Sequence, residues 1–189
     1  MSVRSDTALV VIDVQESFRY RPYWDAAEVP EFLDKLQLLV DGAQARAMPV
    51  LQVFHVEDTG VFSLASGNVV TMAGLTISPT AQFYKRSHSA LIGSGLDVWL
   101  VRHGIRRLIV SGIRTEQCCE TTTRHASDAG YQVDYVTEAT LTFAMTDRKG
   151  RVWPPAEIRA RTELVLETRF ARIVDVRGAL TAPDKRLSA

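Results

Sequence analysis

The sequence predicts a three-layer α/β/α sandwich built on a six-stranded parallel sheet. First, short apolar runs rich in β-branched residues alternate with longer segments of helical period, which is typical of consecutive β-α-β units. Second, the run Thr7–Asp13 is apolar almost throughout and ends in a carboxylate, as expected of a strand buried on both faces. Third, 189 residues with 46% apolar content suit one domain with a substantial core.

The N-terminal half contains one complete β-α-β unit and a long loop. Apolar residues recur at helical spacing over residues 29–47, and Met48–Pro49 ends this helix before a strand at residues 50–54. Residues 55–78 are rich in Gly, Ser, Thr and Asn and have no period. We therefore expect a loop there that covers a pocket or an oligomer contact, followed by a short strand at residues 81–84.

The C-terminal half continues the alternation. The predicted elements are a helix at 95–104, a strand at 107–111, a helix at 115–129, a strand at 131–136, a helix from Pro154–Pro155 to Glu167 and a strand at 171–176. Residues 182–189 are expected to form a loose tail. We predict a single domain over residues 1–189, with its core at about residues 7–176.

Composition restricts the class of partner. Lys plus Arg and Asp plus Glu both number 22, so the formal net charge is zero and no overall basic field attracts nucleic acid or an anionic membrane. The polar start has no signal-peptide core, and no stretch is long enough to span a bilayer. We expect a cytoplasmic protein with a small-molecule substrate. The two cysteines, Cys118 and Cys119, are adjacent, which excludes a disulfide framework.

Cys118 is the most informative residue. It follows the apolar run Leu108–Val110 and a glycine turn at Gly112, and it begins a predicted helix. A thiol there experiences unpaired backbone N–H groups and the positive end of the helix dipole, which favour the thiolate. The sequence therefore predicts a nucleophilic thiol with a lowered pKa.

Two further polar residues fall just past the ends of predicted strands. Asp13 ends the first strand and Lys85 follows the third, as Cys118 follows the fourth. In open parallel sheets the binding crevice lies at the carboxyl ends of the strands, so these three side chains could converge there. Taken singly, Asp13 could cap a loop, Lys85 could be a solvated charge and Cys118 could be a buried small apolar residue.

Three segments together resemble the isochorismatase-like cysteine hydrolases, the superfamily that contains nicotinamidases, N-carbamoylsarcosine amidase and ureidoacrylate amidohydrolases. Val11–Phe18 is similar to the aspartate motif of that family, Lys85–Leu91 to its lysine motif and Gly112–Cys118 to its cysteine motif. The order of the motifs also matches, so the resemblance covers about residues 7–176. Three matches in the right order favour the catalytic interpretation over the three separate structural ones.

The resemblance implies a mechanism. Cys118 would attack an amide or similar carbonyl, Asp13 would move the thiol proton to the leaving amine, and Lys85 would stabilise the anionic pair. Water would then release the thioester. The family also has a cis peptide, here Ile113–Arg114, and its oxyanion hole would consist of the backbone N–H groups of Arg114 and Cys118. A homo-oligomer is expected by the same resemblance.

The loop before the lysine motif departs from the nicotinamidase pattern of metal ligands. It offers only His55, with Glu57 and Asp58 nearby. We expect no metal and no cofactor, and we interpret His55 as a surface group.

The cysteine motif also departs from the family pattern. Arg114 stands where the family has a small residue, and Glu116 where it has Asp or Asn. Arg114 could pair with Glu116, Glu120 or Glu138, or it could bind a carboxylate or carbonyl of the substrate. Phe18 is a further candidate for substrate binding, as an aromatic pocket wall. Cys119 is expected to serve packing alone.

Three functions remain in competition at this point. The first is metal-independent cysteine hydrolysis of a C–N bond in a small amide, carbamoyl or ureido compound. The second is isochorismatase-type vinyl-ether hydrolysis, which does not need Cys118. The third is a non-catalytic oligomeric scaffold or a thiol redox sensor, since a reactive thiol is also easily oxidised.

Overall fold

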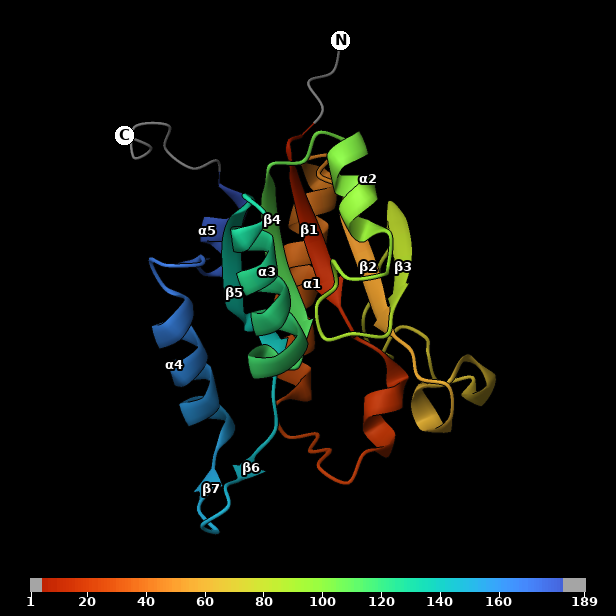
Figure 1. Ribbon diagram of the computed structural model, residues 1–189, viewed down its shortest axis with the longest axis vertical. Helices are drawn as coiled ribbons and strands as arrows, with labels where there is room; N and C mark the ends of the chain where they lie inside the picture. Colours follow the sequence, from red (N-terminus) through yellow and green to blue (C-terminus); the bar gives the residue numbers. More distant parts are fainter. Residues whose placement is uncertain (1–4, 182–189) are drawn as a thin grey trace.

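A computed structural model describes residues 5–181 and confirms the predicted fold class (Figure 1). Six parallel strands form one sheet in the order β3-β2-β1-β4-β5-β8. Their bounds are β1 Thr7–Ile12, β2 Val50–His55, β3 Ala81–Lys85, β4 Arg107–Ile113, β5 Gln132–Leu141 and β8 Arg172–Ile173. The tail predicted at 182–189 lies outside the described residues.

Helices cover both faces of this sheet. Their bounds are α1 Val29–Ala45, α2 Leu96–Arg102, α3 Glu120–Asp128, α4 Pro155–Leu166 and α5 Val176–Leu180. α1 lies on one face, together with α5, whereas α2 and α3 lie on the other, with α4 beside α3 (Figure 1). In residues 5–181 no helix is long and apolar enough to cross a bilayer.

The two faces of the sheet carry separate apolar cores. β1 has no exposed side chain, because its alternate residues point into opposite layers: Leu9 and Val11 pack on the α1 side, and Val10 and Ile12 on the α2 and α3 side. α1 buries Phe32, Leu33, Leu36, Leu39, Val40 and Ala43, a spacing that places them on one helical face. The continuous apolar pattern of β1 therefore reflects its central place in the sheet.

The chain order reverses between β1 and β4. β1, β2 and β3 extend toward one edge of the sheet, and β4, β5 and β8 toward the other. β1 and β4 are hydrogen-bonded neighbours in register from Thr7 with Arg107 to Ile12 with Gly112. This is the topological switch point, where connections leave in opposite directions and open a crevice beyond the strand ends.

Most predicted elements match the structure, and the differences lie in the C-terminal part. β5 extends to Leu141, past the predicted end at residue 136, with a register irregularity against β4 between Val110 and Gly112. The strand predicted at 171–176 is reduced to β8, because the Asp175 side chain accepts a hydrogen bond from the Gly178 N–H and begins α5. The basic turn after Asp147 connects two short antiparallel strands, β6 (Met145–Thr146) and β7 (Val152–Trp153).

A buried charge cluster joins the strands far from the crevice. Arg107 and Asp134 are both almost fully buried and form an ion pair, while the half-exposed Arg172 donates to Asp134 at 2.7 Å. Burial lowers the pKa of Arg107 to about 10. The cluster links β4, β5 and β8, so its loss should affect stability rather than chemistry.

We expect Asp134→Ala to lower the free energy of unfolding by about 3 kcal/mol, because it leaves the Arg107 guanidinium buried without its partner. Urea unfolding would measure the change. Arg172→Ala is the matched control: it removes the exposed partner and should cost less than about 1 kcal/mol. Equal losses in the two variants would show that burial of Arg107 is not the cause.

Candidate active site

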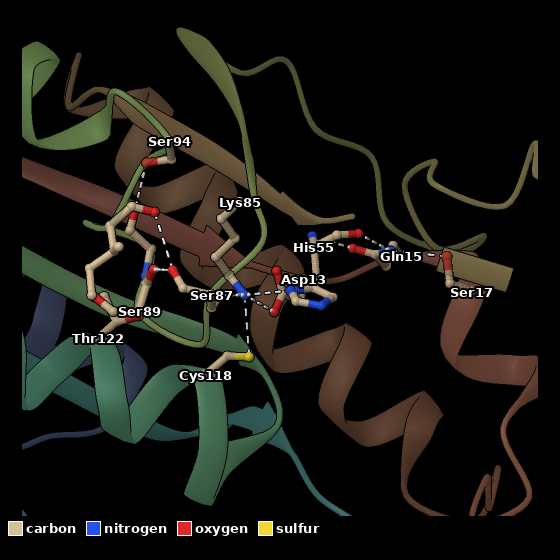
Figure 2. Close-up of polar contacts among 12 residues, drawn as sticks. Asp13, Gln15, Ser17, His55, Lys85, Ser87, Ser89, Ser94, Cys118 and Thr122 are labelled. Carbon is tan, nitrogen blue, oxygen red and sulfur yellow. Dashed lines mark hydrogen bonds and ion pairs between the residues drawn. The ribbon is translucent and has the colours of Figure 1, made fainter. Parts of the chain in front are cut away.

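Asp13, Lys85 and Cys118 meet at the carboxyl edge of the sheet (Figure 2). Lys85 Nζ lies 2.8 Å from Asp13 Oδ2 and 3.3 Å from Cys118 Sγ. The side chains of Asp13 and Lys85 are completely buried, and Cys118 is 7% exposed. Apart from Lys85, neither carboxylate oxygen of Asp13 has a hydrogen-bond partner in the described chain. The carboxylate is therefore paired by charge on one side and free to accept a proton.

The switch point places the carboxylate beside the cysteine segment. Asp13 follows β1 directly, has a positive φ of 55° and donates its N–H to the Val53 carbonyl on β2. On β4, Gly112 pairs with Ile12 and has a φ of 128°. A Cβ on Gly112 would overlap the Ile12 backbone, so only glycine allows β4 to approach β1 this closely just before the cysteine segment.

Cys118 lies in a π-helical turn, η4 (Thr115–Cys119), that leads into α3. The Ile113–Arg114 peptide bond before this turn is cis. The N–H groups of Gln117 and Cys119 donate to the Arg114 carbonyl, whereas the Cys118 N–H does not, and the Arg114 N–H donates to no backbone carbonyl of the described residues. Of the two N–H groups named for the oxyanion hole, that of Arg114 thus directly precedes this turn and that of Cys118 belongs to its fourth residue.

The loop that follows Lys85 is tied to the helix that follows Cys118. Ser89 Oγ lies 2.8 Å from His125 Nδ1 on α3, and the Ala90 N–H donates to Thr122 Oγ1 at 2.9 Å. Lys85 itself donates to the Ser87 carbonyl at 3.0 Å. These contacts fix the position of the ammonium relative to the thiol, although β3 and β4 are not neighbours in the sheet.

The expected direction of the thiol pKa was wrong. Burial raises the pKa of Cys118 well above its ordinary value, the Asp13 carboxylate raises it further, and Lys85 only partly opposes them. For Lys85, burial lowers the pKa, but the charge of Asp13 and the neighbouring Cys118 outweigh burial, so its pKa is raised. The resting site therefore contains a neutral thiol beside an ion pair.

Arg114 is engaged by Glu116. Its guanidinium lies 3.0 Å from the Glu116 carboxylate and 4.8 Å from the centre of the Tyr23 ring, and Thr142 donates to Glu116 at 2.6 Å. The pairing with Glu116 is one of the alternatives predicted for Arg114. Its Nε has no hydrogen-bond partner in the described residues, so part of the guanidinium is available to another acceptor.

His55 is not the surface group that the sequence predicted. Its side chain is only 18% exposed, and its Nδ1 lies 3.3 Å from Lys85 Nζ (Figure 2). A ring nitrogen that faces an ammonium does not fit a metal ligand, and residues 5–181 contain no group of three or more His, Cys, Asp or Glu side chains arranged to hold a metal.

Sequence reasoning missed Gln15. This fully buried amide accepts the His55 N–H at 2.8 Å and donates to the His55 carbonyl at 3.1 Å and to Ser17 Oγ at 2.9 Å. It follows Asp13 by two residues and joins the loop after β1 to the end of β2. Its place two residues after Asp13, inside the segment Val11–Phe18 that carries the aspartate motif, is the sequence feature that could have revealed it.

Phe18 and Cys119 are both buried. Phe18 is 5% exposed and packs edge-to-face on Phe62, with ring centres 5.1 Å apart, in the α1-side core. Cys119 lies in the opposite core with no exposed surface, consistent with a packing role.

A buried carboxylate, ammonium and thiol thus lie together at the switch point of a three-layer α/β/α sandwich. The isochorismatase domain model matches residues 7–153, so the chain belongs to the isochorismatase family and is a hydrolase.

Relatives agree with this assignment. An isochorismatase family protein of Bacillus subtilis, YrdC, is 22% identical over 170 residues, which cover 88% of this chain and 90% of the relative. Nicotinamidase 3 of Arabidopsis thaliana is 28% identical over 152 residues, which cover 72% of this chain and 73% of the relative. The crystal structure of a cysteine hydrolase from Pseudomonas syringae pv. phaseolicola shares the fold, with a TM-score of 0.83, 20% identity, and coverage of 93% of this chain and 91% of that one.

We expect Gly112→Ala to destabilise the protein by several times more than the approximately 1 kcal/mol that a left-handed backbone costs alanine. The added Cβ would force β4 away from Ile12 and displace the cysteine segment from Asp13. Gly104→Ala is the control, because Gly104 also has a positive φ but has open space around its Cβ position. Thermal unfolding of both variants would measure the difference, and similar losses would contradict a close-approach constraint at Gly112.

Proposed function

We propose that this hydrolase cleaves a C–N bond of a small amide, carbamoyl or ureido substrate through a thioester on Cys118. The observation that carries the proposal is the contact of one buried ammonium, Lys85 Nζ, with both Asp13 and Cys118. A thiol is a strong nucleophile only as its thiolate, and the two partners it needs are a base and a cation. Asp13 and Lys85 supply them.

The raised pKa of Cys118 supports Asp13 as the base of the first step. Because the resting thiol is neutral, Asp13 takes its proton as Sγ forms a bond to the carbonyl carbon. When the tetrahedral intermediate collapses, the C–N bond breaks and Asp13 gives this proton to the leaving nitrogen. Water then attacks the thioester carbon, its proton passes through Asp13 to the departing sulfur, and the free thiol returns.

The developing oxyanion needs donors that are not already used. We propose the backbone N–H groups of Arg114 and Cys118. In the described residues the Arg114 N–H donates to no backbone carbonyl, and the Cys118 N–H does not donate to the Arg114 carbonyl, which accepts from Gln117 and Cys119. Lys85 keeps its positive charge beside the sulfur throughout, which offsets the charge that moves between Asp13 and Cys118.

The relatives support an amide rather than a vinyl ether. The Arabidopsis relative is named a nicotinamidase, and the Pseudomonas syringae neighbour is named a cysteine hydrolase. Vinyl-ether hydrolysis does not need a thiol nucleophile, whereas acyl transfer through a thioester does. We also propose that the enzyme acts as a cytoplasmic homo-oligomer.

Cys118→Ala should lower kcat/KM for the active substrate by about a thousandfold or more, because among the described residues no other thiol or hydroxyl side chain hydrogen-bonds to Lys85. Ammonia release from a panel of small amide, carbamoyl and ureido compounds, in buffer with EDTA, would measure this. Cys119→Ala is the matched control, since it removes the adjacent thiol, which lies in the core, and should leave kcat unchanged.

Two outcomes would contradict the proposal. Turnover that persists in Cys118→Ala would indicate vinyl-ether chemistry, to be checked with isochorismate. No ammonia release by the wild type from any compound of the panel would favour the thiol-sensor interpretation. Mass spectrometry of Cys118 after peroxide treatment would test that interpretation.

We further propose that Arg114 and Phe18 contribute to substrate binding. In the part of the chain that the structure describes, the Arg114 Nε has no hydrogen-bond partner. The backbone N–H of the same residue is one of the two proposed for the oxyanion hole. Arg114→Ala should raise KM about tenfold for substrates with a second carbonyl or carboxylate oxygen, and leave simple amides unaffected. Steady-state kinetics on paired substrates would check this, with Arg148→Ala, on the exposed turn, as the control. Equal KM changes for both substrates would contradict it.

A further inference from the structure

His55 occupies the gap that Lys85 must cross. In the strand order β3-β2-β1, Lys85 at the end of β3 is separated from Asp13 after β1 by the end of β2. Adjacent strands lie about 4.8 Å apart, so the ammonium has to bridge about 10 Å from one backbone to the other. His55 is the last residue of β2 and is in register with Lys85. Its ring therefore lies beside the path of the lysine side chain.

The imidazole meets the ammonium directly. His55 Nδ1 is 3.3 Å from Lys85 Nζ, so it is the fourth group around a nitrogen that also contacts Asp13, Cys118 and the Ser87 carbonyl (Figure 2). An ammonium can only donate, so Nδ1 must be the unprotonated acceptor nitrogen of a neutral ring with its proton on Nε2. Nε2 lies 3.7 Å from Glu57 Oε1, the side toward which that proton points.

Both the backbone and the ring of His55 are held in place. The Gln15 amide fixes the His55 backbone through its N–H and its carbonyl, and the Phe62 ring packs edge-on against the imidazole at 5.8 Å between ring centres. Gln15 donates a second hydrogen bond to Ser17 Oγ. A group that was merely a surface histidine would need none of these contacts.

We infer that His55 is a positioning residue for the reaction: as a neutral acceptor it fixes the Lys85 ammonium between Asp13 and Cys118. This inference rests on the proposed role of Cys118 and Lys85. The ammonium has only three N–H groups for these four partners, so at least one N–H is shared between two of them. With partners on every side, the ammonium stays within reach of the sulfur and does not move toward Asp13 alone. Loss of the fourth partner should leave Asp13 and Lys85 paired and weaken the contact with Cys118.

Several charged groups face His55. Burial lowers the pKa of the imidazole below its ordinary value, Lys85 and His88 lower it further, and Asp13 and Glu57 act in the opposite direction. The ring is therefore neutral near pH 7. Below that range a second proton would place a cation against Lys85 and break the contact.

The test uses substitutions that distinguish the two ring nitrogens. The Oδ1 of Asn can take the place of Nδ1, the Oε1 of Gln reaches the place of Nε2, and Leu offers no acceptor. We expect His55→Leu and His55→Gln to lower the rate constant for iodoacetamide alkylation of Cys118 about tenfold, the lower end of what a hydrogen bond to a charged group contributes. His55→Asn should recover most of the wild-type rate. Peptide mass spectrometry would assign the alkylation to Cys118, and circular dichroism would check folding.

A double variant tests whether His55 acts through Lys85. If it does, His55→Leu in a Lys85→Met background should produce no further loss beyond that of Lys85→Met alone. Additive losses, or a His55→Leu variant that reacts at the wild-type rate, would overturn the inference. His103→Leu removes a histidine that stacks on Trp99 far along the chain and should leave the rate unchanged.

Alkylation separates this inference from the proposed function, because it requires no substrate. Reduced alkylation in His55→Leu with no activity in any amide assay would sustain the positioning role and reject amide chemistry. Loss of amidase activity in Cys118→Ala together with normal alkylation in His55→Leu would support the amide chemistry and reject the positioning role. Where an active amide is found, His55→Leu should lower kcat with little change in KM, since the contact orients a reacting group and does not touch substrate.

The pH dependence of stability gives an independent readout. Unfolded His55 has its ordinary pKa near 6.5, and the folded value is lower, so the unfolded state binds more protons between the two values. The free energy of unfolding should therefore fall as the pH decreases below 6.5 toward the folded pKa. The slope should be shallower in His55→Asn than in the wild type. Identical slopes would show that the ring is not held as a neutral acceptor.

Discussion

The buried ion pair between Lys85 and Asp13 is the constraint on which the rest of the site depends. Both side chains are completely excluded from solvent at 2.8 Å, and removing two charges from water costs several kcal/mol for each ion even after relaxation. Such a pair persists only where further polar contacts compensate it. The Ser87 carbonyl, the His55 ring and the Cys118 sulfur supply these contacts to the ammonium. The segments that carry these three residues must therefore lie close to Lys85.

The same pair explains why the thiol does not ionise at rest. Asp13 disfavours a second negative charge nearby, and burial disfavours any charge on sulfur, so the pKa of Cys118 is raised in spite of Lys85. The site has one negative charge to distribute between two acidic groups. A proton that moves from Cys118 to Asp13 transfers this charge to sulfur without changing the total, and the ammonium remains in contact with both groups. The site is thus arranged to move a proton rather than to store a thiolate.

Asp13, Lys85 and Cys118 could be found in the sequence because parallel strands bring their carboxyl ends to one edge. Asp13 and Lys85 directly follow predicted strands, and Cys118 lies in the first turn of the helix predicted after the next strand. The direction of the thiol pKa could not be found in this way. Helix position is visible in the sequence, but the depth of burial and the distance to Asp13 depend on how β4 packs against β1. His55 was misjudged for a similar reason, because its acidic sequence neighbours suggest the surface while its register with Lys85 places the ring inside.

The C-terminal part shows the same limit for the fold. Residues 171–176 have the composition of a strand, but the strand ends at Ile173. The Asp175 side chain instead accepts a hydrogen bond from the Gly178 N–H and caps α5. Whether such a segment continues as a strand or begins a helix depends on which hydrogen-bond partner lies within reach of its polar side chain.

Charge balance also limits what the site can accept. The pair of Asp13 and Lys85 is neutral, Cys118 carries no charge at rest, and Arg114 is balanced by Glu116 at 3.0 Å. With no uncompensated charge among these groups, a substrate gains no net Coulomb attraction on entry and must be held by hydrogen bonds and apolar contact. A neutral carbonyl suits such a site, because the donors proposed for it face a charge that develops only during the reaction. Binding energy is then greatest in the transition state, where it accelerates the chemical step.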